Sequence, residues 1–500
     1  MSTMNTLPVA VIGAGPIGLA AGARLLERGL TPLILEAGAS AGANLRTFAH
    51  VQLFSPWRYD VDEACVRLLS ETGWTMSQPD ALPTAGEFID QYLQPLVSDT
   101  RLASHVRLSH RVVAIARANV DKLKTLNREE SPFVLRASTP SGEQEIYARA
   151  VIDASGTWGQ PNPLGANGLP ALGEASLRER IAYGMPDILG ANRSRYARKR
   201  VLVVGAGHSA AGNLLALAQL ADIESQTQIV WAIRGENFAK IFGGGAADGL
   251  PARGALGLRL KALREAGRIE VHADFLIHRI ESIRGKITVY PVHGSSASPI
   301  EGIDEIICST GSRPNLAMTQ ELRLKLDPAL ETTEALAPLI DPNEHSCGTV
   351  RPHGHRELAH PEHGYYAVGA RSYGRAPTFL LVTGYEQARS VVAALAGDIA
   401  SADEAQLVLP ETGVCSTDFV DAGLSGCGSN CAPPPTGLAV STQASGSQKE
   451  SASCCGGAAK LNADACCVAD EEAKAIGESG CRCSSPKAAA SEKTSSSCCA

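Results

Sequence analysis

The chain has 500 residues, of which 44% are hydrophobic and 19% are charged, and its formal net charge is −7. This length exceeds one ordinary domain and predicts two or three. Charges of both signs are interspersed, so we expect no nucleic-acid or membrane partner, and the apolar runs are too short or too interrupted to span a bilayer. We therefore expect a cytoplasmic protein.

The first strong pattern is VAVIGAGPIGLAAGARLLERGLTPLILE, residues 9–36. It predicts a buried strand, a glycine turn, a helix and a second strand. The turn contains GxGxxG at Gly13, Gly15 and Gly18, with Pro16 inside it, and this motif lets a pyrophosphate approach the helix start. Glu36 ends the second strand, where a carboxylate can accept ribose hydroxyls. A signal peptide would need a basic flank, which this segment lacks. The pattern therefore predicts a dinucleotide-binding domain.

Several shorter elements follow this domain start. A glycine-rich loop at 42–45 and an aromatic segment come first, and Pro83–Leu96 has the apolar spacing of an amphipathic helix. Two strand-like stretches, 112–116 and 133–137, resemble a small antiparallel insert. The buried strand 150–153 then enters the turn ASGTWGQPN.

A second dinucleotide motif lies in RVLVVGAGHSAAGNLLALAQL, residues 200–220. Residues 201–204 predict the strand, and Gly205, Gly207 and Ala210 occupy the three small-residue positions. His208 and Ser209 begin the helix, so we expect them near the phosphates on the nicotinamide side. This second motif predicts a second dinucleotide-binding domain.

The next strand, 228–233, ends in Arg234 instead of an acid. A guanidinium group fits a ribose 2′-phosphate as a fork, whereas a carboxylate would favour an unphosphorylated ribose. The second nucleotide is therefore predicted to be NADPH. The alternative is an arginine at a strand end with no such role.

The last part of the folded region repeats the first. Residues 303–309 predict a strand that enters TGSRPN, beginning at Thr310 and Gly311, which mirrors the earlier ASGTWGQPN turn and suggests a crossing back between domains. Residues 364–369 predict a strand and turn. We predict a strand at 379–382, followed by a helix over 383–396 that Thr383 caps.

Cysteine is distributed unevenly. Only Cys65, Cys308 and Cys347 precede residue 415, and the other 11 lie within residues 415–500, a stretch rich in Ser, Ala and Gly. Such a tail cannot bury a core, so we expect it to be disordered. Soft thiolates favour soft ions, and neighbouring thiols can chelate one trivalent centre. The predicted metal or metalloid ligands are Cys454, Cys455, Cys466, Cys467, Cys481, Cys483, Cys498 and Cys499.

The cysteines of the folded body require separate interpretations. We expect Cys308, inside a strand, to be a small buried residue. Cys65 falls on a predicted helix, and Cys347 lies in a loop with five histidines, residues 343–364. This loop could cover a cofactor or form a polar surface excursion, and a fixed zinc site there is the weaker alternative.

The two motifs in this order, with the two mirrored turns, resemble flavin-containing monooxygenases and, more widely, thioredoxin-reductase-like flavoproteins. The resemblance implies an α/β fold with two Rossmann-like domains, the NADPH domain being inserted in the FAD domain. The implied parts are 1–164 and 302–398 for FAD, 165–301 for NADPH, and 399–500 for a Cys-rich tail.

The resemblance also implies where the cofactors bind. It places FAD on the first motif and Glu36, and NADPH on the second motif and Arg234. Further contacts are expected from Gly42 and Leu45, Thr310 and Gly311, Gly369, Thr383 and Gly384. Two departures are visible. The Baeyer–Villiger signature FxGxxxHxxxW is absent from the sequence, and Gly369-Ala370-Arg371 replaces the usual Gly-Asp pair.

With its Cys-rich end, the chain is similar to flavin monooxygenases of arsenic and antimony resistance operons. We therefore predict an NADPH-dependent FAD monooxygenase that uses dioxygen to oxidise trivalent arsenic or antimony, a homodimer being left open. Gln52, Ser55 and Trp57 are the predicted catalytic residues, and Cys65 and Cys347 the predicted substrate ligands. The alternatives are a thiol or metal reductase that passes electrons to the tail cysteines, and a flavoprotein that sequesters metal.

Overall fold

The computed structural model of this chain describes residues 6–76, 78–242, 251–345 and 350–407. Its first sheet is parallel, with the strand order β16-β7-β1-β2-β3. The strands are β1 (Val9–Ile12), β2 (Pro32–Leu35), β3 (Val106–Arg107), β7 (Ala150–Asp153) and β16 (Tyr365–Ala367). The central strands β1 and β7 are buried along their whole length, as expected for a parallel sheet covered on both faces.

The second sheet repeats this architecture. Its order is β11-β10-β9-β15-β8, and all its described pairings are parallel. Its strands are β8 (Ile181–Tyr183), β9 (Arg200–Val204), β10 (Gln228–Ala232), β11 (Glu270–His272) and β15 (Glu305–Cys308). Two parallel sheets, each with a strand–glycine turn–helix unit at its centre, confirm the predicted α/β fold with two Rossmann-like domains.

Two small antiparallel sheets accompany them. The first, β4-β5-β6, contains β4 (Arg111–Arg117), β5 (Phe133–Thr139) and β6 (Gly142–Ala148), and the second contains β12 (Ile277–Ile283), β13 (Lys286–Pro291) and β14 (Ile300–Ile303). The predicted antiparallel insert corresponds to the first. Its third strand, β6, and the whole of the second sheet went unpredicted because their exposed faces carry polar residues that weaken the apolar pattern.

Helices cover both parallel sheets. Around the first sheet lie α1 (Pro16–Glu27), α2 (Ala43–Arg46), α3 (Trp57–Asp60), α4 (Glu63–Ser70), α5 (Ala85–Phe88), the π-helix η2 (Ile89–Leu93), α6 (Gln94–Ser98), α11 (Ala337–Ile340), α12 (Leu381–Leu395) and α13 (Ile399–Asp403). The second sheet carries α7 (Arg193–Tyr196), α8 (His208–Ile223), α9 (Phe238–Phe242) and α10 (Pro251–Glu265). Short 3₁₀ turns are η3 (Arg101–His105), η4 (Ala175–Arg180), η6 (Ala317–Thr319) and η7 (Gly369–Arg371).

Three predicted elements differ from the structure. The segment 379–382 is not a strand, because α12 begins at Leu381 and its N-cap is Leu380, so Thr383 is a buried helical residue instead of a cap. The predicted strand 303–309 corresponds to β15, which is shorter at both ends, and only its first residue, Ile303, belongs to β14 of another sheet. Short apolar runs do not distinguish a strand from a buried helical turn, which explains the first error.

The predicted helix 83–96 and loop 42–45 also need adjustment. The helix begins at Ala85, and Thr84 caps it together with Glu87 in a reciprocal capping box. A π-helical turn, η2, interrupts its middle. The predicted loop contains α2, and Gly42 is the N-cap residue of that helix with a φ of 62°.

The two mirrored turns lie side by side. The Asn162 backbone N–H donates to the Gly311 carbonyl at 3.0 Å, and the Thr310 hydroxyl donates to the Asn162 carbonyl at 2.8 Å. The Thr157 and Ser312 hydroxyls are 2.9 Å apart. One of these segments leaves the first sheet and the other leaves the second, so this pairing fits a chain that crosses between two domains. The exact domain boundaries stay a prediction.

Candidate functional site

The first glycine motif forms an open cradle at the start of α1. Gly13 has a φ of +101°, and a Cβ atom on Gly18 would lie 2.0 Å from the Gly13 carbonyl oxygen, so both positions require glycine. By contrast, a Cβ atom on Gly15 would meet nothing within 4 Å. Gly15 is the N-cap residue of α1, and no side chain caps this helix. The helix start therefore faces open space, as pyrophosphate binding requires.

Glu36 lies beside this cradle. One carboxylate oxygen accepts the Ala14 backbone N–H and the other accepts that of Gly38, both at 2.7 Å. Glu36 is 8% exposed. Each oxygen keeps a lone pair, so the carboxylate can still accept ribose hydroxyls. The backbone contacts fix its orientation at the edge of the cradle.

The second glycine motif has the same geometry. Gly205 has a φ of +134°, and a Cβ atom there would lie 2.2 Å from the Ser309 carbonyl oxygen, whereas one on Gly207 would meet nothing within 4 Å. Gly207 is the N-cap residue of α8, again without a side-chain cap. Ala210, in the third position, is fully buried. Arg234 is exposed just beyond β10. These residues therefore form a second open cradle.

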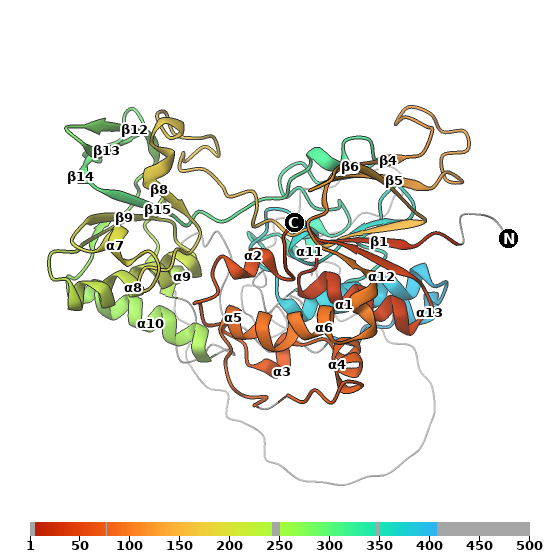
Figure 1. Cartoon of the computed structure of the whole chain (residues 1–500). Helices are drawn as coiled ribbons and strands as arrows, with labels where there is room; N and C mark the ends of the chain where they lie inside the picture. The colour runs from red at the N-terminus through yellow and green to blue at the C-terminus, as the bar shows by residue number, and fades with distance from the viewer. Residues whose placement is uncertain (1–5, 77, 243–250, 346–349, 408–500) are drawn as a thin grey trace, which may run out of the picture. The chain divides into compact units, whose positions relative to one another are not determined.

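A third helix start, that of α12, lies next to α1 (Figure 1). Thr383 and Gly384 are in its first turn, and a Cβ atom on Gly384 would lie 2.6 Å from Ile17 Cδ1. Gly369 has a φ of +68°, and its backbone N–H donates to Gln387 Oε1 at 2.7 Å. The predicted flavin contacts at Gly369 and Gly384 therefore belong to neighbouring turns, tied together by a buried glutamine that the sequence did not indicate.

Arg371 has a structural role in this neighbourhood. Its guanidinium group donates to Asp153 Oδ2 at 2.9 Å, and the Tyr365 hydroxyl donates to the same oxygen at 2.9 Å. Arg371 is 3% exposed and Asp153 is fully buried. Arg371 therefore forms a buried ion pair that links η7 to β7.

Residues 52–60, which we call the junction segment, contact helices that belong to each of the two parallel sheets. At one end the Phe54 ring lies 5.0 Å from the ring of His208, the first residue of α8. At the other end the Tyr385 hydroxyl, from the first turns of α12, donates to the Asp60 backbone carbonyl. The junction segment therefore extends from the second cradle to the start of α12.

The predicted catalytic residues all belong to the junction segment. Gln52 is exposed and forms a bridge with Thr84, whereas Trp57 is 8% exposed and packs on Phe88 at 5.8 Å between ring centroids. Ser55 Oγ donates to Asp60 Oδ1 at 2.5 Å. Their catalytic roles stay predictions.

Asp60 is the functional candidate that the sequence analysis missed. It is fully buried, its Oδ2 atom has no hydrogen-bond partner among the described residues, and burial raises the pKa of this carboxyl to about 7. Buried carboxyls with such shifts are concentrated at functional sites. The only sequence signal was its position in a run of aromatic residues, since Asp60 was indistinguishable from an exposed aspartate.

The two cysteines that the structure describes, Cys65 and Cys308, are buried. Cys65 on α4 and Cys308 on β15 are 0% and 2% exposed, and burial raises the pKa of both thiols. Because thiolates, not thiols, bind soft ions, Cys65 in this conformation does not suit a substrate ligand. Cys347 and the eight predicted tail ligands, Cys454, Cys455, Cys466, Cys467, Cys481, Cys483, Cys498 and Cys499, lie outside the described residues.

Three histidines in the described part of the histidine-rich loop, His353, His355 and His360, contact the rest of the protein or are buried in it. His353 Nε2 lies 2.8 Å from Gln387 Nε2, and burial lowers the pKa of this histidine. His355 contacts Asp403 at 2.8 Å, and burial lowers the pKa of His360 to about 4. Within the described ranges, no group of three or more His, Cys, Asp or Glu side chains could hold a metal ion. These contacts favour a structural role for the loop.

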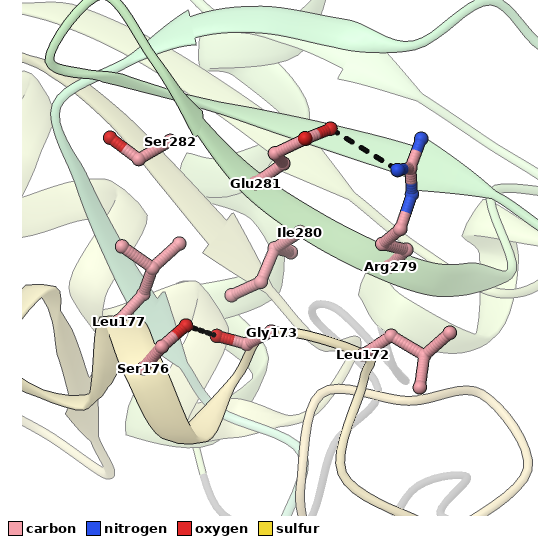
Figure 2. A pocket seen from close by; sticks show the side chains of 8 residues that line it. All are labelled: Leu172, Gly173, Ser176, Leu177, Arg279, Ile280, Glu281 and Ser282. Atoms are coloured by element: carbon pink, nitrogen blue, oxygen red, sulfur yellow. Dashed lines mark hydrogen bonds and ion pairs between the residues drawn. The ribbon is translucent and has the colours of Figure 1, made fainter.

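A surface hollow of about 270 Å³ lies elsewhere, between η4 and β12 (Figure 2). Ser176, Arg279 and Glu281 contribute to its wall, and the two charged side chains pair at 3.2 Å. None of the predicted site residues lines this hollow. Separately, no helix in the described part of the chain has the length and apolarity needed to cross a membrane.

Solved structures with the same fold are distant in sequence. Bacillithiol disulfide reductase from Bacillus cereus is 17% identical with a TM-score of 0.57, over 78% of this chain and 99% of that chain. The cadaverine monooxygenase of desferrioxamine biosynthesis from Erwinia amylovora, solved with FAD, is 16% identical with a TM-score of 0.56, over 81% and 98%. The ornithine N-hydroxylase from a Kutzneria species is 19% identical with a TM-score of 0.52, over 79% and 98%.

The family comparison covers most of the chain. No curated protein matches it. A profile described as pyridine nucleotide-disulphide oxidoreductase matches residues 10–347, which include both glycine motifs. This match confirms the predicted resemblance to two-dinucleotide oxidoreductases and the prediction of an enzyme. The chain therefore belongs to the pyridine nucleotide-disulphide oxidoreductase family.

Proposed function

We propose that the protein is an NADPH-dependent FAD monooxygenase that oxidises a soft nucleophile, namely trivalent arsenic or antimony. The observation that carries this proposal is the junction segment, which contacts His208 at the start of α8 and Tyr385 at the start of α12. A flavin held at α1 and α12 and a nicotinamide held at α8 would meet beside this segment. FAD and NADPH are the cofactors of this proposal.

The residues present fit both cofactors. The uncapped start of α1, with Gly15 facing open space, suits the FAD pyrophosphate, and Glu36 suits its ribose. The α8 start, with Gly207 facing open space, suits the NADPH pyrophosphate, with His208 and Ser209 beside it. Arg234 suits the 2′-phosphate. Gly42, Leu45, Gly369 and the start of α12 would surround the rest of the flavin.

The cofactors supply the redox chemistry, and the protein orients them and excludes water. Held at the starts of α1 and α12, FAD would supply electron transfer from NADPH to dioxygen. One oxygen atom enters the substrate and the other leaves as water. A thiol or metal reductase similar to mercuric reductase would need a redox CxxxxC beside the flavin, and the sequence has no CxxxxC before residue 415. This sequence feature favours oxygenation over a reductase of that kind.

The metalloid substrate is inferred from the Cys-rich end. Adjacent thiols at 454–455, 466–467 and 498–499 suit a soft trivalent ion. A tethered thiol site raises the local concentration of its ligand near the reaction site. The tail is therefore proposed to recruit arsenite or antimonite for oxidation.

The test measures NADPH and oxygen consumption by the purified protein with arsenite, antimonite, sulfides and amines, together with the oxidation state of the product. We expect stimulation by a trivalent metalloid and a pentavalent product. Stimulation by amines or sulfides alone would refute the metalloid substrate but keep the monooxygenase. Failure to bind FAD would refute the proposal as a whole.

Removal of residues 415–500 should leave the oxygenase active. Because the cofactor sites lie before residue 415, we expect kcat for arsenite oxidation to stay within about twofold and KM to rise about tenfold through loss of the local-concentration effect. Steady-state kinetics of the truncated and full chains would check this. Loss of all electron transfer on truncation would instead support the reductase that passes electrons to the tail.

Arg234→Ala should weaken NADPH selectively. A hydrogen-bonded contact with a charged group contributes about 1.5–3 kcal/mol, so we expect KM for NADPH to rise about 10- to 100-fold while KM for NADH changes little. The control is Arg136→Ala, since Arg136 is an exposed arginine on β5, paired with Glu145. Equal losses with the two nucleotides would contradict the role given to Arg234.

A further inference from the structure

The strongest unexplained group in the described residues is the Asp60 carboxyl. It is fully buried at the end of α3, and its two oxygens have different surroundings. Oδ1 accepts the Ser55 hydroxyl at 2.5 Å, whereas Oδ2 has no hydrogen-bond partner in the described part of the chain. An ionised carboxylate in this position would leave a charged oxygen without a hydrogen bond, which is costly.

A neutral carboxyl removes this difficulty. With Oδ1 accepting from Ser55, the acidic proton is placed on Oδ2, which then is a donor without a protein acceptor. Burial raises the pKa of Asp60 to about 7, opposed by the Ser55 hydrogen bond, so the neutral form is well populated near neutral pH. The structure thus presents one O–H donor that the fold itself does not use.

Among the described residues, no positively charged side chain pairs with Asp60 to stabilise its ionised form. Tyr385 reaches Asp60 from α12, and its own pKa is raised well above its ordinary value by burial and by Cys65, Asp62 and Asp60. The Tyr92 hydroxyl of η2 accepts the Asp62 backbone N–H at 2.9 Å. Two arginines close to this group are paired with other carboxylates, Arg24 of α1 with Asp62 at 2.6 Å and Arg58 of α3 with Asp80.

We propose that Asp60 is the proton donor of the oxygenation reaction, transferring its Oδ2 proton to the oxygen atom that leaves as water. This inference rests on the proposed monooxygenase function. NADPH, dioxygen, one proton and the reduced substrate give NADP⁺, water and the oxygenated substrate. Asp60 supplies that proton and becomes a carboxylate. Ser55 is partly exposed, so its hydroxyl can relay the replacement proton from solvent.

The first test compares Asp60→Asn with the wild type, both loaded with FAD. We expect the rate of substrate oxygenation to fall about 100-fold, as removal of a general acid does. In the wild type, kcat should fall as pH rises through about 7, because the donor must be protonated. This alkaline limb should be absent from Asp60→Asn. Asp99→Asn, which changes an exposed aspartate after α6, is the matched control.

Ser55→Ala provides a second variant with a signed expectation. The Ser55 hydrogen bond lowers the Asp60 pKa, so its removal should move the alkaline limb of kcat to higher pH. A limb that stays in place in Ser55→Ala, or persists in Asp60→Asn, would overturn the proposal. A purely structural role would change the amount of folded enzyme without moving the limb.

A readout independent of turnover is the infrared spectrum of the resting protein. The wild type at pH 6 should show the carbonyl stretch of a buried protonated carboxyl, and this band should be missing from Asp60→Asn and retained in Asp99→Asn. Absence of the band from the wild type would refute the neutral Asp60. Wild-type protein that shows the band yet has no NADPH-dependent oxygen consumption would contradict the proposed monooxygenase, not the protonation of Asp60.

Discussion

Gly15→Val should give a folded protein that no longer retains FAD. A Cβ atom at Gly15 would meet nothing within 4 Å, and the backbone there has a φ of −81°, so the fold accepts a side chain. The valine would instead occupy the space that the pyrophosphate needs at the start of α1. We expect FAD affinity to fall at least about 100-fold, or about 2.7 kcal/mol.

The measurement is FAD absorbance after gel filtration, with circular dichroism to establish folding. Gly207→Val is the matched variant at the second cradle, where a Cβ atom also meets nothing within 4 Å. It should keep FAD and lose NADPH binding. Gly18→Ala should fail differently, through loss of folded protein, because its Cβ would lie 2.0 Å from the Gly13 carbonyl oxygen. FAD retained by Gly15→Val would contradict the assignment of this cradle.

Glu362→Gln should cause the largest loss of stability. The Glu362 carboxylate accepts from Arg117 at 2.8 Å and from Arg128 at 2.7 Å, and all three side chains are at least 96% buried. It also accepts the Arg323 backbone N–H at 2.9 Å. Removing the negative charge leaves two buried guanidinium groups without their counter-ion, and breaking such pairs costs about 3–5 kcal/mol.

Chemical denaturation of the two proteins would measure this difference in the free energy of unfolding. Glu145→Gln is the control, since Glu145 forms an exposed pair with Arg136 and its loss should cost no more than about 1 kcal/mol. A similar loss in both variants would contradict the special role of the buried cluster.

The same cluster predicts a pH dependence. Although burial opposes it, hydrogen bonds from Arg128 and Arg117 lower the pKa of Glu362 below its ordinary value of 4.5. The folded state therefore holds the carboxylate more strongly than the unfolded chain does. Its contribution to stability is complete above pH 4.5 and declines as the pH falls toward the lowered value. Glu362→Gln should lack this part of the acid dependence.

Local patterns predicted the parts of the site that depend on neighbouring residues in sequence. The strands β1 and β9 and the uncapped helices after them follow from glycine motifs that need only a few consecutive residues. Glu36 could be placed because a second strand ends just before it. The sequence therefore predicts both cradles without information about tertiary contacts.

Other features depend on partners far along the chain. Asp60 owes its buried position to packing between α3 and α12, and Arg371 is paired with Asp153, 218 positions earlier. Gln387 contacts Gly369 from a different turn. No periodicity or spacing reports such pairings in a single sequence, so these side chains looked like ordinary polar residues.

The paired crossing segments have a mechanical consequence. A single connecting segment between two domains would allow the domains to rotate about it, because such rotation breaks few noncovalent contacts. Here the segment around Asn162 is hydrogen-bonded to Thr310 and Gly311, so rotation of one domain against the other would break these hydrogen bonds. Relative motion that keeps these hydrogen bonds is therefore more restricted than rotation about one connecting segment would be.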